Sequence, residues 1–135
     1  MTYALDANII SYILQKQEKM LNRLKAEIAL GNHIVIPPIV YYEIRRGLLS
    51  SNSIKKAALF ETLFGKLDID VIDRETLEMA AIEYARLRKA GHTVGDADLF
   101  IAEYCVKNDF TLVTNNTIHF KAIKGLRYVN WLEES

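Results

Sequence analysis

Three acidic residues occupy positions where the surrounding pattern favours an apolar side chain. Asp6 directly follows an apolar strand, and the carboxyl ends of strands in open α/β sheets form the crevice where ligands bind. Glu43 falls at the edge of the apolar stripe of its helix, and Asp98 begins a row that continues through Ile101 and Cys105. A buried carboxylate is costly unless it is paired or bound to a metal. A divalent cation with oxygen ligands is the simplest common explanation.

Each of these acids also has a purely structural explanation. Asp6 can cap the helix that begins directly after it, and Glu43 can form an ion pair with Arg46. Asp98 can be favoured by the dipole of its own helix, because a carboxylate in the first turn is stabilised there. The sequence leaves these alternatives open for each acid taken singly.

Other polar residues lie near the expected positions of the acids. Thr114, Asn115 and Asn116 follow an apolar strand, where hydroxyl and amide groups can orient carboxylates or metal-bound water, although a plain Asn turn explains them equally well. Asp96 follows Gly95 and does not share a helix face with an acid two positions later. We therefore interpret Asp96 as the helix N-cap or as a supporting residue.

The elements that must position these residues alternate between short apolar runs and longer stretches of helical period. This pattern predicts an α/β fold built from βαβ units around a short, mainly parallel sheet of about five strands. The expected strands are Thr2 to Leu5, His33 to Ile36, Ile69 to Ile72, Thr111 to Thr114, and a weaker one at Tyr128 to Asn130.

Amphipathic helices are expected between these strands. One spans Glu18 to Leu30, and another is capped by Asp73. Pro37 and Pro38 predict the first turn of a helix that ends near Gly47, and a further helix over Ser53 to Phe64 could form a protruding hairpin with it.

Length and composition restrict the class of protein. The 135 residues are 50% hydrophobic and 25% charged, which predicts one packed domain over residues 1–135. Lys and Arg total 17 against 17 Asp and Glu, so the net charge excludes a uniformly basic binder. The single cysteine, Cys105, indicates a reducing compartment, for which the cytoplasm is the simplest choice. No apolar run approaches the roughly 20 residues that span a bilayer, and the start of the chain does not resemble a signal sequence.

Local basic clusters are the candidate contacts for a nucleic acid. Each cluster is also explained as the solvated face of a helix. The candidates are Arg45, Arg46, Lys55, Lys56, Arg86, Arg88, Lys89 and His92, of which the loop carrying His92 is preferred because it leads toward Asp96.

The ordered set of motifs resembles one known family. The set consists of LDAN at 5–8, YEI at 42–44, DADLFIA at 96–102, and LVTNN at 112–116 with His119 and Phe120. In this order and spacing, the chain resembles PIN-domain proteins, and specifically the VapC toxins of toxin–antitoxin pairs. The resemblance covers essentially the whole chain and implies a three-layer α/β/α sandwich.

The resemblance implies a metal-dependent endoribonuclease. Its three acids correspond to Asp6, Glu43 and Asp98, as catalytic residues and metal ligands. The fourth acidic position of many relatives falls at Asn116, so the resemblance leaves a second metal site open, with Asp96 as the candidate metal ligand that would compensate. Asn8 and Thr114 correspond to polar residues that hold the acids in place. The oxygen-rich donor set favours Mg²⁺, with Mn²⁺ as a substitute, over zinc.

The resemblance also implies partners. These are a cognate antitoxin that covers the acidic site, an RNA substrate for which tRNA is favoured, and a second copy of the chain. Apolar and Tyr-rich faces within residues 39–64 are candidate surfaces for the antitoxin or the second copy. Two alternatives remain at this stage: a catalytically silent module of the same fold, and an aspartyl-phosphate phosphatase. The latter is disfavoured because Asp6-Ala7-Asn8 lacks the second carboxylate such phosphatases use.

Overall fold

Four strands form one parallel sheet in the computed structural model, which describes residues 1–133. β1 (Thr2–Leu5) pairs with β2 (His33–Val35) on one side and with β3 (Thr111–Val113) on the other. β4 (Arg127–Val129) completes the order β2-β1-β3-β4 by pairing with β3. The last three residues of β1 and all of β3 are buried, as expected for the central strands of a sheet covered on both faces.

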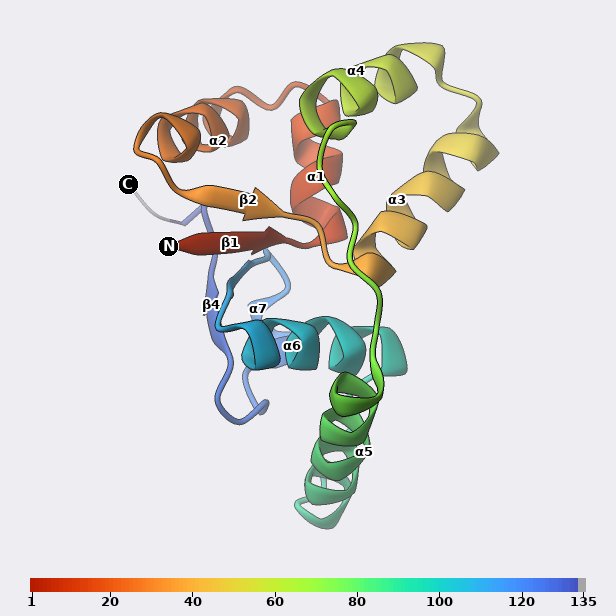
Figure 1. Ribbon diagram of the computed structural model, residues 1–135, viewed down its shortest axis with the longest axis vertical. Helices are drawn as coiled ribbons and strands as arrows, with labels where there is room; N and C mark the ends of the chain where they lie inside the picture. The colour runs from red at the N-terminus through yellow and green to blue at the C-terminus, as the bar shows by residue number, and fades with distance from the viewer. Residues whose placement is uncertain (134–135) are drawn as a thin grey trace.

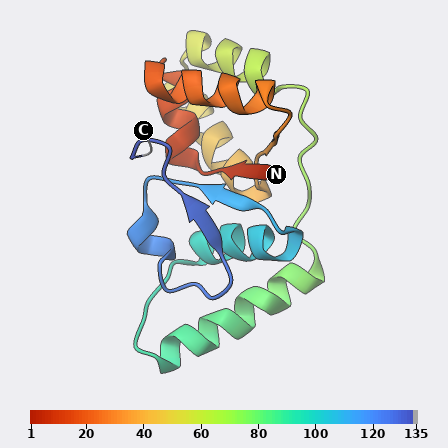
Figure 2. The same ribbon diagram turned by 90° about the vertical axis from the view of Figure 1, so that its left-hand side faces the viewer.

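Helices cover both faces of this sheet (Figures 1 and 2). α1 (Ala7–Leu14), α2 (Glu18–Ala29), α3 (Pro38–Ser51) and α4 (Ile54–Phe64) lie on one side. α6 (Asp96–Asn108) lies on the other side with α5 (Arg74–Lys89) outside it, and the short α7 (Thr117–Phe120) precedes β4. The predicted α/β class with three layers is confirmed. Among residues 1–133, no helix is both long and apolar enough to cross a membrane.

The predicted strand at Ile69 to Ile72 is wrong. These residues form an extended connection between α4 and α5 that is not part of the sheet. Figure 1 shows the reason: the connection runs along the outside of the molecule from the helices on one side of the sheet to those on the other. Ile69 packs against the core, whereas Val71 is 73% exposed. The apolar run therefore indicates packing of one side chain rather than membership of the sheet.

The predicted end of a helix near Gly47 is also wrong, because α3 continues to Ser51. Glycine inside a helix costs about 1 kcal/mol relative to alanine. Ile44 and Leu48, on either side of Gly47, are both buried in the hydrophobic core, and this packing outweighs the local preference. The helix ends instead at Asn52, whose φ of 53° is the left-handed conformation typical of helix C-termini.

A buried carboxyl group lies between α5 and α6. Glu103 is 4% exposed, and burial, together with the nearby Glu83 carboxylate, raises its pKa to about 7 despite the opposing charge of Arg86. Arg86 is itself held by Glu83, with Nε to Oε1 and Nη2 to Oε2 distances of 2.7 Å each. Arg86 also donates to the carbonyl of Ala122 at 2.8 Å. This hydrogen bond attaches the segment before β4 to α5.

Glu103→Gln is expected to stabilise the protein above pH 7. Folding raises the pKa of Glu103, so its contribution to stability is full below the ordinary pKa of 4.5 and is lost as the pH rises through about 7. Gln resembles the protonated acid, so the variant should gain on the order of 1–2 kcal/mol at pH 8 and little at pH 4.5. Urea unfolding across this pH range measures the difference. The exposed Glu78→Gln is the control, and equal gains at both pH values would contradict the assignment.

Candidate active site

The pairing of β1 with β3 brings Asp6 next to Thr114. Leu5 lies opposite Val113 in the sheet, and the Asp6 amide donates to the Val113 carbonyl at 2.9 Å. β1 ends at Leu5 and β3 ends at Val113. Asp6 and Thr114 are the residues that follow, so their side chains lie side by side at the carboxyl edge of the sheet. Both are buried, at 5% and 0% exposure, which is where a parallel sheet places a ligand crevice.

The Asp6 carboxylate is held by three hydrogen-bond donors. Oδ1 accepts from the Ala7 amide at 2.8 Å, which makes Asp6 the N-cap of α1. Oδ2 accepts from the Thr114 hydroxyl at 2.7 Å and from Nδ2 of Asn8 at 3.2 Å. The helix cap and the site position that the sequence left as alternatives are therefore compatible. This network restricts the carboxylate to one orientation.

The other predicted supporting residues join the two strand ends. Oδ1 of Asn8 accepts from the Asn115 amide at 3.0 Å, and the Thr114 hydroxyl accepts from the Asn116 amide at 3.0 Å. The Asn115 side chain donates to the hydroxyl of Tyr12 at 2.9 Å, a contact that the sequence analysis missed. Asn116 contributes its backbone to this network, and its side chain makes no capping hydrogen bond to α7.

Glu43 and Asp98 approach Asp6 from opposite layers. Glu43 comes from α3 and Asp98 from the first turn of α6. Burial raises the pKa of the Glu43 carboxyl, and the charges of Asp6 and Asp98 raise it further against the lowering effect of Arg46. Burial and Asp6 likewise raise the pKa of Asp98, against His119. The three acids therefore form one electrostatically coupled group, in which the charge of Asp6 acts on both Glu43 and Asp98 and the charge of Asp98 acts on Glu43.

Asp96 does not belong to the coupled group of Asp6, Glu43 and Asp98. The N-cap of α6 is Gly95, so the prediction that Asp96 caps the helix is wrong: Asp96 is the first helical residue. Its exposed carboxylate is stabilised by the helix dipole without being the cap. Asp96 lines a groove between α5 and α6 with Tyr84 and Phe100, whereas Asp98 faces a different hollow.

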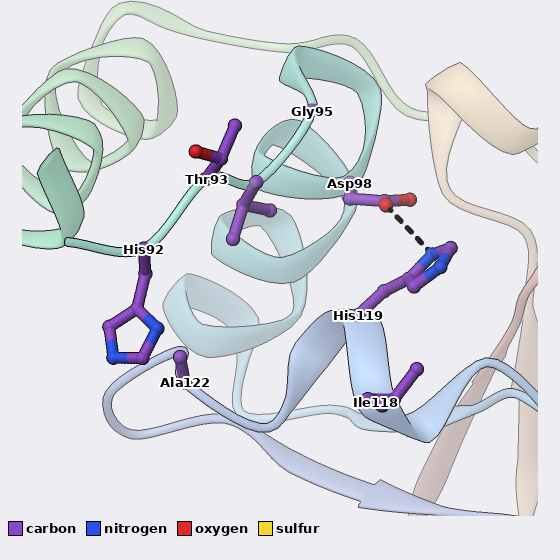
Figure 3. A pocket seen from close by; sticks show the side chains of 8 residues that line it. His92, Thr93, Gly95, Asp98, Ile118, His119 and Ala122 are labelled. Atoms are coloured by element: carbon purple, nitrogen blue, oxygen red, sulfur yellow. Dashed lines mark ion pairs between the residues drawn. The ribbon is translucent and has the colours of Figure 1, made fainter.

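His119 is a site residue to which the sequence analysis gave no function. Its Nδ1 lies 3.4 Å from Oδ2 of Asp98, and the imidazole is half exposed (Figure 3). The two residues are separated by β3 in the chain, so no local spacing could predict the contact. His119 belonged to the family-like motif with Phe120, and that was the only signal available.

The predicted basic contacts are distributed unequally around the acids. Arg46 and Lys56 line a groove of about 360 Å³ together with Glu43, and Arg46 also stacks over the Tyr42 ring at 5.2 Å. His92 lines the hollow that Asp98 faces. Arg86 donates to the Glu83 carboxylate, and Arg88 lies over the Tyr84 ring. The remaining candidates are the half-buried Arg45 and the exposed Lys55 and Lys89, and Arg86 and Arg88 are exposed as well.

The donor chemistry of the three acids fits a hard divalent cation. Their coupled carboxylates supply oxygen ligands and excess negative charge, which Mg²⁺ and Mn²⁺ prefer. Within residues 1–133, no three His, Cys, Asp or Glu side chains stand close enough to enclose an ion by themselves. Mg²⁺ usually takes one or two carboxylates and keeps several water or phosphate ligands.

Comparisons with known proteins identify the family. Residues 3–126 match the PIN domain. Ribonuclease VapC2 of Rickettsia felis is 36% identical, over 97% of this chain and 98% of the relative. Ribonuclease VapC1 of Haemophilus influenzae is 26% identical over 97% and 98%. A chain in the solved structure of VapBC2 from Rickettsia felis, which is bound to a DNA fragment from the VapBC2 promoter, is 30% identical in sequence. It superimposes with a TM-score of 0.84 over 97% of this chain and 99% of that chain.

This chain therefore belongs to the PIN-domain family, and within it to the VapC ribonucleases. The resemblance drawn from the sequence motifs is confirmed, as is the expected class of enzyme. PIN-domain ribonucleases generally depend on a divalent metal, which accords with the oxygen-rich donor set described above.

Proposed function

We propose that this protein is the toxin of a type II toxin–antitoxin pair and that it hydrolyses phosphodiester bonds of RNA, with tRNA as its substrate. The observation that carries the proposal is the fixed Asp6 carboxylate at the junction of β1 and β3, electrostatically coupled to Glu43 and Asp98. The ribonuclease names of relatives that align over nearly the whole chain support the reaction class.

Each acid has a separate task in the proposed mechanism. Asp6, oriented by Thr114 and Asn8, would be the fixed ligand for Mg²⁺ or Mn²⁺, and Glu43 and Asp98 would complete the negative site from α3 and α6. When bound, the cation supplies neutralisation of the phosphate charge and an activated water. Asn115 and Asn116 fix the second strand end through Asn8 and Thr114. The products are expected to carry 5′-phosphate and 3′-hydroxyl ends.

RNA reaches the site through local positive charge in this proposal. Arg46 and Lys56 beside Glu43, with Arg45 on the same helix, would hold phosphates on one side of the acids. On the other side the proposed contacts are His92 and the exposed Arg88 and Lys89 at the end of α5. Arg86 is the weakest of these candidates, because its Nε and Nη2 already donate to the Glu83 carboxylate.

A cognate antitoxin is the proposed inhibitor. The similar solved structure from Rickettsia felis is a VapBC2 complex, and by analogy the present chain would pair with an antitoxin of its own. Tyr42, Leu49 and Ile54 are between 59% and 84% exposed on α3 and α4, and Tyr42 lies under the guanidinium group of Arg46, which lines the groove that contains Glu43. This apolar face suits an antitoxin segment that carries a basic residue to the acids. We also propose a single domain over residues 1–135, a toxin homodimer and a cytoplasmic location, where tRNA is found.

The test is cleavage of a total tRNA pool by purified, antitoxin-free protein. Discrete fragments are expected with Mg²⁺ or Mn²⁺, and none with EDTA or with Asp6→Asn, which keeps the size of the side chain but removes its charge. Sequencing of the fragment ends identifies the cleaved bond and the chemistry of the ends. Intact RNA with the folded wild-type protein in every metal would reject the catalytic proposal and favour a silent binding module.

A further inference from the structure

A hollow of about 470 Å³ adjoins Asp98 and shares no lining residue with the groove that contains Glu43. It lies between the α5–α6 loop and α7, as Figure 3 shows, and its volume is in the range of pockets for small organic ligands. The residues that line it are His92, Thr93, Val94, Gly95, Asp98, Ile118, His119 and Ala122.

Two imidazole rings stand at separate positions around this hollow. His119 rises from α7 beside Asp98, and His92 stands across the hollow on the loop (Figure 3). The His92 backbone is fixed, because its amide donates to the carbonyl of Leu87 at 2.9 Å and closes the end of α5. Gly91, with φ of 80°, permits this closure. Both rings are therefore carried by short, anchored segments.

The rest of the lining is largely apolar. Val94, Ile118 and Ala122 contribute aliphatic surface, and Ile118 is 80% exposed at the edge of the hollow. Among the described residues that line it, none is Lys or Arg, so the hollow offers no fixed cation for a phosphate. His92, His119 and Asp98 do not form a metal site either, because no three such side chains within residues 1–133 are close enough. Flat rings and aliphatic walls suit a planar, uncharged group.

We propose that this hollow is a subsite for one nucleobase of the RNA substrate, next to the bond that is cleaved. The inference rests on the proposed ribonuclease function and adds a specificity-determining contact to it. The splayed base stacks against the His92 ring, His119 borders it at the end of the hollow beside Asp98, and Val94 and Ile118 supply aliphatic contacts. The phosphate on the same nucleotide then lies toward Asp98 and the other acids.

The first test observes the imidazole rings directly by NMR. The chain has three histidines, and the third, His33, is exposed on β2 in a different part of the sheet. The probes are AMP, GMP, CMP and UMP, with ribose 5-phosphate as the probe that lacks a base. Nucleotides should shift the ring signals of His92 and His119 and leave His33 unchanged. Absence of shifts, equal shifts of all three histidines, or the same shifts with ribose 5-phosphate would overturn the proposal.

The second test measures RNA itself, with single His variants as matched controls. His92→Ala should raise KM for a tRNA fragment that contains the cleaved bond by about tenfold, because loss of one base stack typically costs 5- to 150-fold. His92→Phe should restore KM, since it keeps a flat ring, and His33→Ala should match wild type. Circular dichroism checks that each variant is folded.

These outcomes separate the subsite from the proposed function. Cleavage by wild type with equal KM for His92→Ala and His33→Ala would reject the subsite and leave the ribonuclease function standing. Selective histidine shifts with nucleotides, in a protein that cleaves no RNA, would support a base pocket and reject the function.

Discussion

Asp98→Asn is expected to reduce the rate of RNA cleavage by about 10²–10⁴-fold without destabilising the fold. The size of the loss is that of a residue that acts directly on the reacting groups. The fold should be retained because burial and the charge of Asp6 raise the pKa of Asp98, so its ionised form is disfavoured in the folded protein. A neutral Asn removes that repulsion, and the melting temperature should stay constant or rise above pH 4.

Single-turnover cleavage and thermal unfolding of the same preparation measure the two effects together. Asp96→Asn is the informative comparison, because Asp96 is on the same helix turn but lines the groove with Tyr84 and Phe100. It should keep most of the activity, as should the exposed Asp68→Asn in the connection after α4. Equal losses for Asp96→Asn and Asp98→Asn would show that the two carboxylates act together and that their separation in the structure does not govern function.

The acids could be predicted from the sequence because each contradicts its local pattern. Asp6 directly follows a buried strand, and Asp98 starts an apolar row on its helix, so each carboxylate requires a compensating partner in the folded protein. The partnership itself depends on the sheet register, which places Leu5 against Val113. The periodicity of the apolar residues does not reveal this register. The family-like motifs pointed to the grouping of the acids only through the resemblance to a known fold.

The contacts that the sequence analysis missed are those between distant segments. His119 contacts Asp98 because α7 lies beside α6 in the fold. Arg86 donates to the Ala122 carbonyl because the segment before β4 lies against α5. The Ile69 to Ile72 segment was predicted as a strand because one-sided packing of a connection and membership of a sheet produce the same apolar run. In each case the outcome depends on where the segment lies in the tertiary structure, which residue type and periodicity alone do not determine.

Thr114→Val tests whether the hydrogen-bond network around Asp6 matters for catalysis as well as for folding. The hydroxyl of Thr114 donates to Asp6 Oδ2 at 2.7 Å and accepts from the Asn116 amide at 3.0 Å, in a fully buried position. Val has nearly the same shape but leaves both groups without this partner. We expect a loss of about 1.5–3 kcal/mol in unfolding free energy, the usual size for a hydrogen bond to a charged group.

Cleavage should fall by about 10–100-fold in the same variant, measured well below its melting temperature, because Asp6 loses the contact that orients it. Thr114→Ser keeps the hydroxyl and should retain most of the activity, with a loss of about 1 kcal/mol for the missing methyl group. Thr111→Val is the matched control on the same strand, since the Thr111 hydroxyl makes no side-chain hydrogen bond within residues 1–133. If Thr114→Val lost stability but cleaved RNA at the wild-type rate, the network would be structural, and Asp6 would be oriented by Asn8 and the α1 cap alone.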